Sequence, residues 1–172
     1  MSALHEILES DEKPKLKIAL MGDALRRNRR LTAELIECFI GGSAGDQGNC
    51  MAAIEYASRD EPAAAADALG FVIEHLNDKP PRVRWEAAGA FANLARQYPV
   101  RAAEAVPRLL ANTKSERTVV RWSAATALTQ IARHHAASRR ELLPKFEALA
   151  RKETNNGVRN IYVKALAFLA KE

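Results

Sequence analysis

The stretch VRWEAAGAFANLA at residues 83–95 returns twice further along the chain, as VRWSAATALTQIA at 120–132 and VRNIYVKALAFLA at 158–170. The three copies align without gaps, and their starts are 37 and 38 residues apart. Within each copy the apolar residues recur every three or four positions, which is the period of an α-helix with one buried face. Such a helix cannot bury that face alone, so it must stack on its neighbours. The repeat predicts a helical solenoid.

A second helical pattern precedes each copy, so the repeating unit is a helical hairpin. VPRLLAN at 106–112 and LPKFEALA at 143–150 precede the second and third copies, and PAAAADALGFVIEHL at 62–76 precedes the first. Two more degenerate units come earlier. We therefore predict an all-α, right-handed α-α superhelix of about ten helices, a single domain over 1–172. Its five hairpins are expected at about 1–29, 30–60, 61–98, 99–136 and 137–172, with loops at 41–48, 77–81, 112–118 and 153–157.

The composition agrees with packed helices. Of 172 residues, 48% are hydrophobic, 27% are charged and only 6% are aromatic, which argues against a disordered chain and against a β-sandwich. No stretch reaches the roughly 18 apolar residues of a membrane span, and MSALHEILES lacks the basic and apolar regions of a signal peptide. We therefore expect a cytoplasmic protein that does not contact membranes. Cys38 and Cys50 are expected to be reduced, because no second cysteine pair lies near them.

The charge is divided unevenly along the chain. Residues 1–79 contain 9 Lys and Arg against 14 Asp and Glu, a net charge of −5, whereas residues 80–172 contain 17 against 7, a net charge of +10. This asymmetry suggests an acidic partner at the basic end, either protein or nucleic acid, or head-to-tail self-association. Solvated helix faces would give the same pattern without any partner.

The order of these features resembles the HEAT-repeat family, in which a helix that often bears a proline is followed by a second helix opening with Val-Arg. The resemblance is strong from about residue 62 and weak before it. It implies that an acidic residue in the turn pairs with the arginine of the second helix, and that these pairs form a ladder through the stack. Asp78 precedes Arg84 by six residues, and Glu153 precedes Arg159 by six. Before Arg121 the corresponding position is a serine.

Helix geometry gives the three arginines a structural role independently of the family. At about 100° per residue, Arg84 falls inside the arc that contains Ala87, Ala88 and Phe91. Arg121 and Arg159 fall in the same place in their own helices. A guanidinium within an apolar arc must be paired, because an unpaired buried charge costs several kcal/mol.

The opposite arc of each second helix is the candidate binding surface. In HEAT-like superhelices the second helices line the concave face, so these arcs would form a groove of aromatic, basic and amide side chains, a surface that solenoids use for binding. Its candidate residues are Trp85, Asn93, Arg96, Trp122, Thr126, Gln130, Arg133, Asn160 and Lys164. An alternative is that Trp85 and Trp122 pack between neighbouring second helices.

Several other patterns fail as chemical sites. GGSAGDQG at 41–48 lacks the Gly-Lys-Ser/Thr ending of a phosphate loop and is expected to be a mobile loop between repeats. His134 and His135 are adjacent, so on a helix they diverge by about 100° and do not clamp a metal. No serine or cysteine has a recognisable base. We therefore expect no cofactor, no metal and no catalytic residue.

Two function classes remain. The first is a non-enzymatic scaffold or adaptor that holds a protein or peptide in its concave groove. The second is nucleic-acid binding through the basic C-terminal half. One HEAT-like family consists of DNA glycosylases, which would want a carboxylate beside the tryptophans, but Glu86 is the only acid in the predicted groove.

The last helix pattern also suggests weak self-association. It places Ile161 and Phe168 on an arc that is mostly polar in the two preceding units, and Val163 on the side that a further repeat would cover. Terminal repeats of a solenoid normally need a polar outer face. We therefore expect this end to dock against a second copy or a partner protein.

Overall fold

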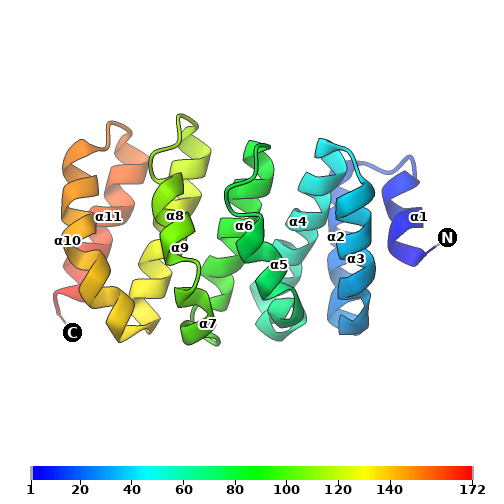
Figure 1. Cartoon of the computed structure of the whole chain (residues 1–172), viewed down its shortest axis with the longest axis horizontal. Coiled ribbons are helices and arrows are strands. Elements are labelled where there is room, and N and C mark those ends of the chain that lie inside the picture. Colours follow the sequence, from blue (N-terminus) through cyan, green and yellow to red (C-terminus); the bar gives the residue numbers. More distant parts are fainter. Residues whose placement is uncertain (1, 172) are drawn as a thin grey trace.

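The computed structural model describes residues 2–171 as a single row of stacked helical hairpins (Figure 1). Eleven α-helices and two short 3-10 helices, η1 and η2, account for all the regular structure in this part of the chain, which contains no strand. The two ends of the chain lie at opposite ends of the row. The predicted all-α solenoid is confirmed.

The helices pair in chain order. The successive hairpins are α1 (Ala3–Glu9) with α2 (Pro14–Arg27); η1 (Arg29–Leu31) and α3 (Thr32–Gly41) with α4 (Ala44–Asp60); η2 (Pro62–Ala68) and α5 (Leu69–Glu74) with α6 (Pro81–Leu94); α7 (Pro99–Ala103) and α8 (Val106–Asn112) with α9 (Thr118–His134); and α10 (Ala136–Lys152) with α11 (Asn156–Leu169). The second helices α2, α4, α6, α9 and α11 each pack against the next, so they form one continuous layer.

The first helices are less regular than the sequence suggests. The alanine-rich start of the third unit is the 3-10 helix η2, and the first helix of the fourth unit is broken into α7 and α8. Pro107 and Pro144 align in the repeat, but Pro107 lies in the first turn of α8 whereas Pro144 lies inside the continuous helix α10. A proline lacks an N–H, which matters little in the first turn and removes a hydrogen bond further in.

The prediction of a mobile loop at residues 41–48 is wrong. The helix α4 begins at Ala44, so only two residues connect it to α3. Ser43 accepts a hydrogen bond from the backbone N–H of Asp46, and the Asp46 carboxylate accepts one from the Ser43 N–H at 3.0 Å, which makes a capping box. Gly48 is buried, and a β-carbon there would come within 2.8 Å of the Arg82 side chain. Gly48 therefore allows α4 and α6 to pack closely.

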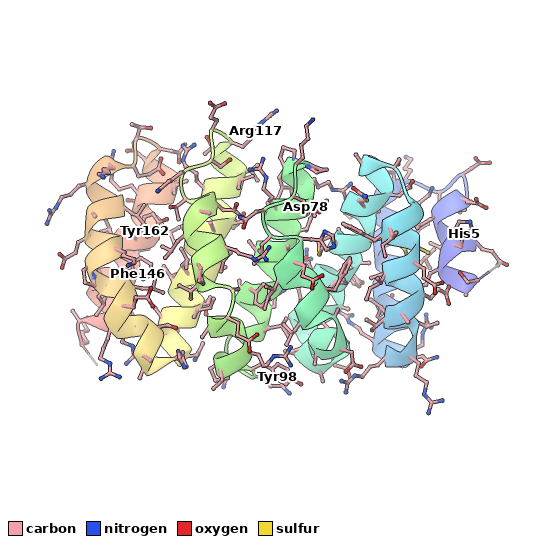
Figure 2. All side chains as sticks on the ribbon, in the orientation of Figure 1. His5, Asp78, Tyr98, Arg117, Phe146 and Tyr162 are labelled. Carbon is pink, nitrogen blue, oxygen red and sulfur yellow. The ribbon has the colours of Figure 1, made fainter. Side chains whose placement is uncertain are left out.

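The core lies between the two layers of helices and contains many alanines. Ala87, Ala88 and Ala90 of α6 are fully buried, and small side chains let neighbouring helices approach closely. Larger side chains fill the remaining space. At the C-terminal end Phe146 of α10 and Tyr162 of α11 pack together with ring centroids 5.5 Å apart (Figure 2).

Both cysteines are free, as expected, and both are buried. Burial, together with the nearby Cys38 and Asp46, raises the pKa of the Cys50 thiol to about 12, so it is neutral and unreactive at physiological pH. Among residues 2–171 no three His, Cys, Asp or Glu side chains gather as a metal site would require. None of the described helices is long and apolar enough to cross a membrane.

Candidate functional site

The two tryptophans of the predicted groove line one pocket at the junction of α4, α6 and α9. This pocket has a volume of about 160 Å³, and its walls include Trp85 and Glu86 from α6 and Trp122 and Thr126 from α9. Trp122 is 50% exposed and Trp85 is half-buried, and neither belongs to the hydrophobic core. The alternative that these rings only fill space between repeats is therefore disfavoured.

The helix α4 contributes one acidic and one basic side chain to the groove that were not predicted from the sequence. Glu55 and Arg59 both line the tryptophan pocket. They form a close ion pair one helical turn apart, with Arg59 Nε 2.9 Å from Glu55 Oε1 and an Arg59 terminal nitrogen 2.6 Å from Glu55 Oε2. The Glu55 carboxylate is therefore already matched by a guanidinium of its own helix.

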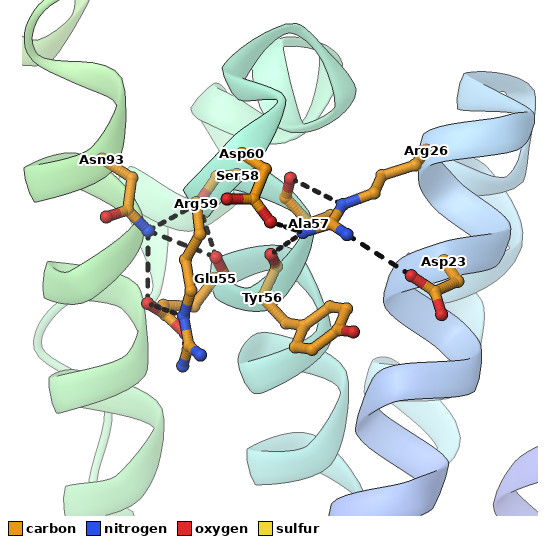
Figure 3. A network of polar contacts seen from close by, with 9 residues as sticks. All are labelled: Asp23, Arg26, Glu55, Tyr56, Ala57, Ser58, Arg59, Asp60 and Asn93. Atoms are coloured by element: carbon orange, nitrogen blue, oxygen red, sulfur yellow. Dashed lines mark hydrogen bonds and ion pairs between the residues drawn. The ribbon is translucent and has the colours of Figure 1, made fainter.

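Asn93 has a different position from the one predicted. Its amide donates to the Glu55 backbone oxygen and to Glu55 Oε1, each at 3.2 Å, and to Ser58 Oγ at 3.0 Å (Figure 3). On the other side of α4, Arg26 of α2 donates to the Tyr56 backbone oxygen at 2.8 Å. These bonds tie three successive second helices together. Asn93 therefore holds the wall of the groove rather than facing into it.

Glu86 is the carboxylate in this pocket that has no close cationic partner. Its side chain is only 19% exposed, and its ion pair with Arg82 is long, with Arg82 Nε 3.8 Å from Glu86 Oε1. Burial and the nearby Glu55 carboxylate raise the pKa of Glu86. The positive charges of Arg82 and Arg59 and a hydrogen bond from the Trp85 side chain lower this pKa, but their combined effect is smaller. The surroundings therefore compensate the charge of Glu86 incompletely.

A second pocket adjoins the first on the side of α11. It has a volume of about 390 Å³ and is bounded by α9 and α11, with Thr126 common to both pockets. Its polar lining includes Gln130, Arg133 and Lys164. The Arg133 guanidinium lies 3.9 Å from the centre of the Phe168 ring, and neither Arg133 nor Lys164 takes part in an ion pair within the described chain. This pocket is basic and apolar.

The nine predicted groove residues divide into two groups. Six line the two adjoining pockets, namely Trp85, Trp122, Thr126, Gln130, Arg133 and Lys164. Arg96 and Asn160 are exposed but lie outside both pockets, and Asn93 bonds to α4. Glu55 and Arg59 were missed because the second unit matches the repeat too poorly to extend the groove rows to α4. Their spacing of four residues with opposite charge was the available signal.

The comparisons with known proteins agree with this architecture. A family model described as HEAT repeats matches residues 69–167, which is more than half of the chain. The chain belongs to the HEAT-repeat family. No curated protein matches the sequence.

Two solved structures resemble this HEAT-repeat protein in fold. A designed armadillo repeat protein in complex with the peptide (KR)4 is 18% identical, with a TM-score of 0.72, and the match covers 96% of this chain and 80% of that one. An engineered protein is also 18% identical, with a TM-score of 0.68, and the match covers 98% of this chain and 78% of that one. At this identity the likeness concerns the fold alone.

Within the described part of the chain, the HEAT repeats carry one complete rung of the predicted ladder, but its partners differ from the expected ones. The Glu153 carboxylate binds Arg121 of the preceding hairpin, with Arg121 Nε 3.0 Å from Glu153 Oε2. Arg121 also donates to the Ser115 backbone oxygen at 2.9 Å. Arg159, which was expected to pair with this carboxylate, instead donates to the Glu153 backbone oxygen at 3.0 Å. The acid therefore links two repeats, while each arginine bonds to a backbone oxygen of its own turn.

The rung expected between Asp78 and Arg84 is absent from the described residues. The Asp78 carboxylate lies 2.6 Å from Nδ1 of His75. The Arg84 Nε is buried and has no hydrogen-bond partner within residues 2–171. In the rung that does form, the turn of the next repeat supplies the acid, because Glu153 of the fifth hairpin pairs with Arg121 of the fourth. The corresponding acid for Arg84 would come from the turn of the fourth hairpin, where Ser115 occupies the position aligned with Glu153. Arg84 therefore lacks the carboxylate that Arg121 has.

Proposed function

We propose that this HEAT-repeat protein is a non-enzymatic adaptor that binds an extended segment of a partner protein in its concave groove. The observation that carries the proposal is the shared wall at Thr126, which joins the tryptophan pocket to the basic pocket. The joined groove is lined by four successive second helices, α4, α6, α9 and α11, and is therefore long enough for several residues of a ligand. Both tryptophans are outside the core and available for contact.

The mixture of side chains in the groove favours a peptide. Trp and Arg are enriched in the residues that dominate binding energy at protein interfaces, and both occur here beside amides and carboxylates. A solenoid presents such a surface on a rigid scaffold, which lowers the ordering cost of binding. The designed armadillo repeat protein of similar fold is itself in complex with a peptide.

Nucleic-acid binding is the second candidate. The net charge of +10 over residues 80–172 and the unpaired Arg133 and Lys164 favour it, because phosphate contacts are made by such side chains. Glu55 and Glu86 oppose it, because a phosphate backbone that followed the groove would pass two carboxylates. The groove is therefore not a continuous basic track, and we place the peptide first.

Selection from a random peptide library displayed on phage, with the full chain as bait, tests the proposal. Selected peptides are expected to bind in fluorescence polarisation, and Trp122→Ala is expected to weaken binding by at least tenfold. Ile40→Ala is a matched control, because Ile40 is also a large exposed apolar residue but lies on α3, a first helix. Equal effects of the two substitutions, or failure to select any binder, would contradict the peptide groove.

The same preparation distinguishes the second candidate. A labelled oligonucleotide is titrated at low and at physiological salt, since binding driven by phosphate neutralisation falls steeply as salt rises. If the oligonucleotide binds and displaces no selected peptide, the groove remains a peptide site. If it binds and Trp122→Ala abolishes that binding, the nucleic-acid reading replaces the adaptor.

A further inference from the structure

We infer that the groove recognises two opposite charges on the same face of an extended peptide. A lysine or arginine side chain enters the tryptophan pocket towards Glu86, and an acidic side chain about three residues away meets Arg133 and Lys164 in the adjoining pocket. This inference rests on the proposed peptide function and specifies the chemistry of the peptide.

The tryptophan pocket has the two elements that a cationic side chain needs. Aromatic faces attract a cation, most strongly when water is excluded, and Trp85 and Trp122 both line this small pocket. The carboxylate of Glu86 is largely buried, and its one cationic contact is the long one to Arg82 at 3.8 Å. A carboxylate has about four acceptor positions, so Glu86 can take further hydrogen bonds from a ligand.

Among residues 2–171, no side chain fills this role already. Arg59 reaches the pocket, but its guanidinium is bound on two sides to Glu55. The residues that α9 contributes carry no charge; they are Val119, Trp122, Ser123 and Thr126. The direction of the Glu86 pKa agrees with this, because a fully compensated carboxylate would not have its pKa raised. A ligand cation would supply what is missing.

The second pocket has the opposite character. Arg133 is held against the Phe168 ring at 3.9 Å, so its guanidinium is positioned before any ligand arrives. Lys164 of α11 lines the same pocket, together with the apolar side chains of Ile161 and Leu169. Two cations without an acidic partner beside an apolar wall favour a carboxylate on an amphipathic ligand.

The helix spacing determines how far apart the two ligand charges should be. The pockets lie on either side of α9, and packed helices are about 8–10 Å apart. In a polyproline II segment about three residues span roughly 9 Å and return the side chain to the same face. In a β-strand, side chains on one face are separated by about 7 Å or about 13 Å, which fits less well. The groove therefore favours a polyproline II ligand with charges three residues apart.

A set of labelled peptides tests the spacing. Each places one lysine and one glutamate in a proline-rich host, in either order, and separates them by two, three or four positions. The three-position pair in one of the two orders is expected to bind the full chain about tenfold more tightly than the others, which corresponds to about 1.4 kcal/mol. Equal affinity for all spacings, or tightest binding of peptides without charge, would overturn the inference.

Variants of the protein test each pocket separately. Glu86→Gln removes the charge with little change of shape and should weaken the lysine-containing peptide about tenfold while leaving its lysine-to-alanine version unaffected. Glu147→Gln, an exposed carboxylate on α10, is the control and should change neither. Arg133→Gln should likewise act only on peptides that contain the glutamate. If Glu86→Gln weakens the binding of both peptides equally, the pocket does not recognise the positive charge of the ligand.

The outcomes separate this inference from the function on which it rests. One outcome is that library peptides bind in a way that depends on Trp122 and yet contain no pair of opposite charges. This result would support the peptide groove and would overturn the inference that the groove recognises two opposite charges. Binding of the lysine peptide should also strengthen as the pH rises through the raised pKa of Glu86, because only the ionised carboxylate attracts the cation. A Glu86→Gln variant with the same pH dependence would contradict the role of Glu86.

Discussion

The guanidinium of Arg121 in the fourth hairpin makes two parallel hydrogen bonds to the carboxylate of Glu153 in the fifth. Nε lies 3.0 Å from Oε2, and a terminal nitrogen lies 3.2 Å from Oε1. The two side chains are only 17% and 8% exposed. Bidentate pairs of this kind fix geometry as well as contribute energy. The contact therefore sets how one hairpin sits on the next.

Breaking this pair should destabilise the whole stack. Arg121→Met is expected to reduce the free energy of unfolding by about 2–4 kcal/mol, because it leaves the buried Glu153 carboxylate with a hydrogen bond from the Asn155 backbone but without a cationic partner. The control is Arg101→Met, which breaks an exposed pair with Glu104 and should cost under about 0.5 kcal/mol. Urea unfolding followed by circular dichroism measures both. Similar losses for the two variants would exclude a special role for the buried pair.

The contribution of Glu153 should depend on pH. Burial raises the pKa of Glu153, but the hydrogen bonds from Arg121 and the Asn155 backbone outweigh it, and the net pKa is below the usual 4.5. The stabilisation is therefore fully present above pH 4.5 and is lost as the pH falls towards the lowered pKa. The difference in stability between wild type and Arg121→Met should shrink in that range. A difference that stays constant on acidification would contradict the ionised pair.

Arg84 should behave in the opposite way to Arg121. Its Nε is buried without a partner, so replacing the guanidinium by an apolar side chain of similar length removes a desolvated polar group. Arg84→Met is expected to change the free energy of unfolding by no more than about 0.5 kcal/mol, or to raise it. A loss as large as that of Arg121→Met would show that Arg84 has a carboxylate partner in solution.

Glu86, which we propose binds the cationic side chain of the ligand, should lower the stability of the folded protein at neutral pH. Its pKa is raised above the usual value, so the folded state holds the proton more tightly than the unfolded state. Stability therefore falls as the pH rises through the window between 4.5 and the raised pKa. Glu86→Gln should raise the melting temperature above this window and have little effect below it. Thermal melts of both proteins at several pH values measure this. If Glu86→Gln does not have a higher melting temperature than wild type at neutral pH, the prediction is refuted.

The C-terminal helix should support weak self-association. Val163 is 48% exposed on α11 and lies outside both groove pockets, whereas Phe168 is covered on one face by Arg133 and Ile161 packs against the core. The Val163→Lys substitution is therefore the sharper probe of the exposed face. Sedimentation at high micromolar concentration should show more dimer for wild type than for this variant. A wild type that is purely monomeric would remove the self-association hypothesis.

Much of the groove could be anticipated because it lies on the most regular helices. The positions of Trp85, Trp122, Thr126, Gln130, Arg133 and Lys164 follow from the period of an α-helix and from the alignment of the repeats. Glu55 and Arg59 could not be placed, because the second unit departs from the repeat. Arg96 lies two residues beyond the end of α6 at Leu94 and outside both pockets.

The sequence by itself determined the α-solenoid and the faces of its second helices, because the apolar period is local and survives without knowledge of any neighbour. Only the tertiary structure decided which residues of different helices meet. Glu153 lies six residues before Arg159 in the chain, yet its carboxylate binds Arg121 of the preceding hairpin. Glu55 lies thirty residues before Trp85, yet both line one pocket. Such pairings depend on the offset between packed helices, which many side-chain contacts set together.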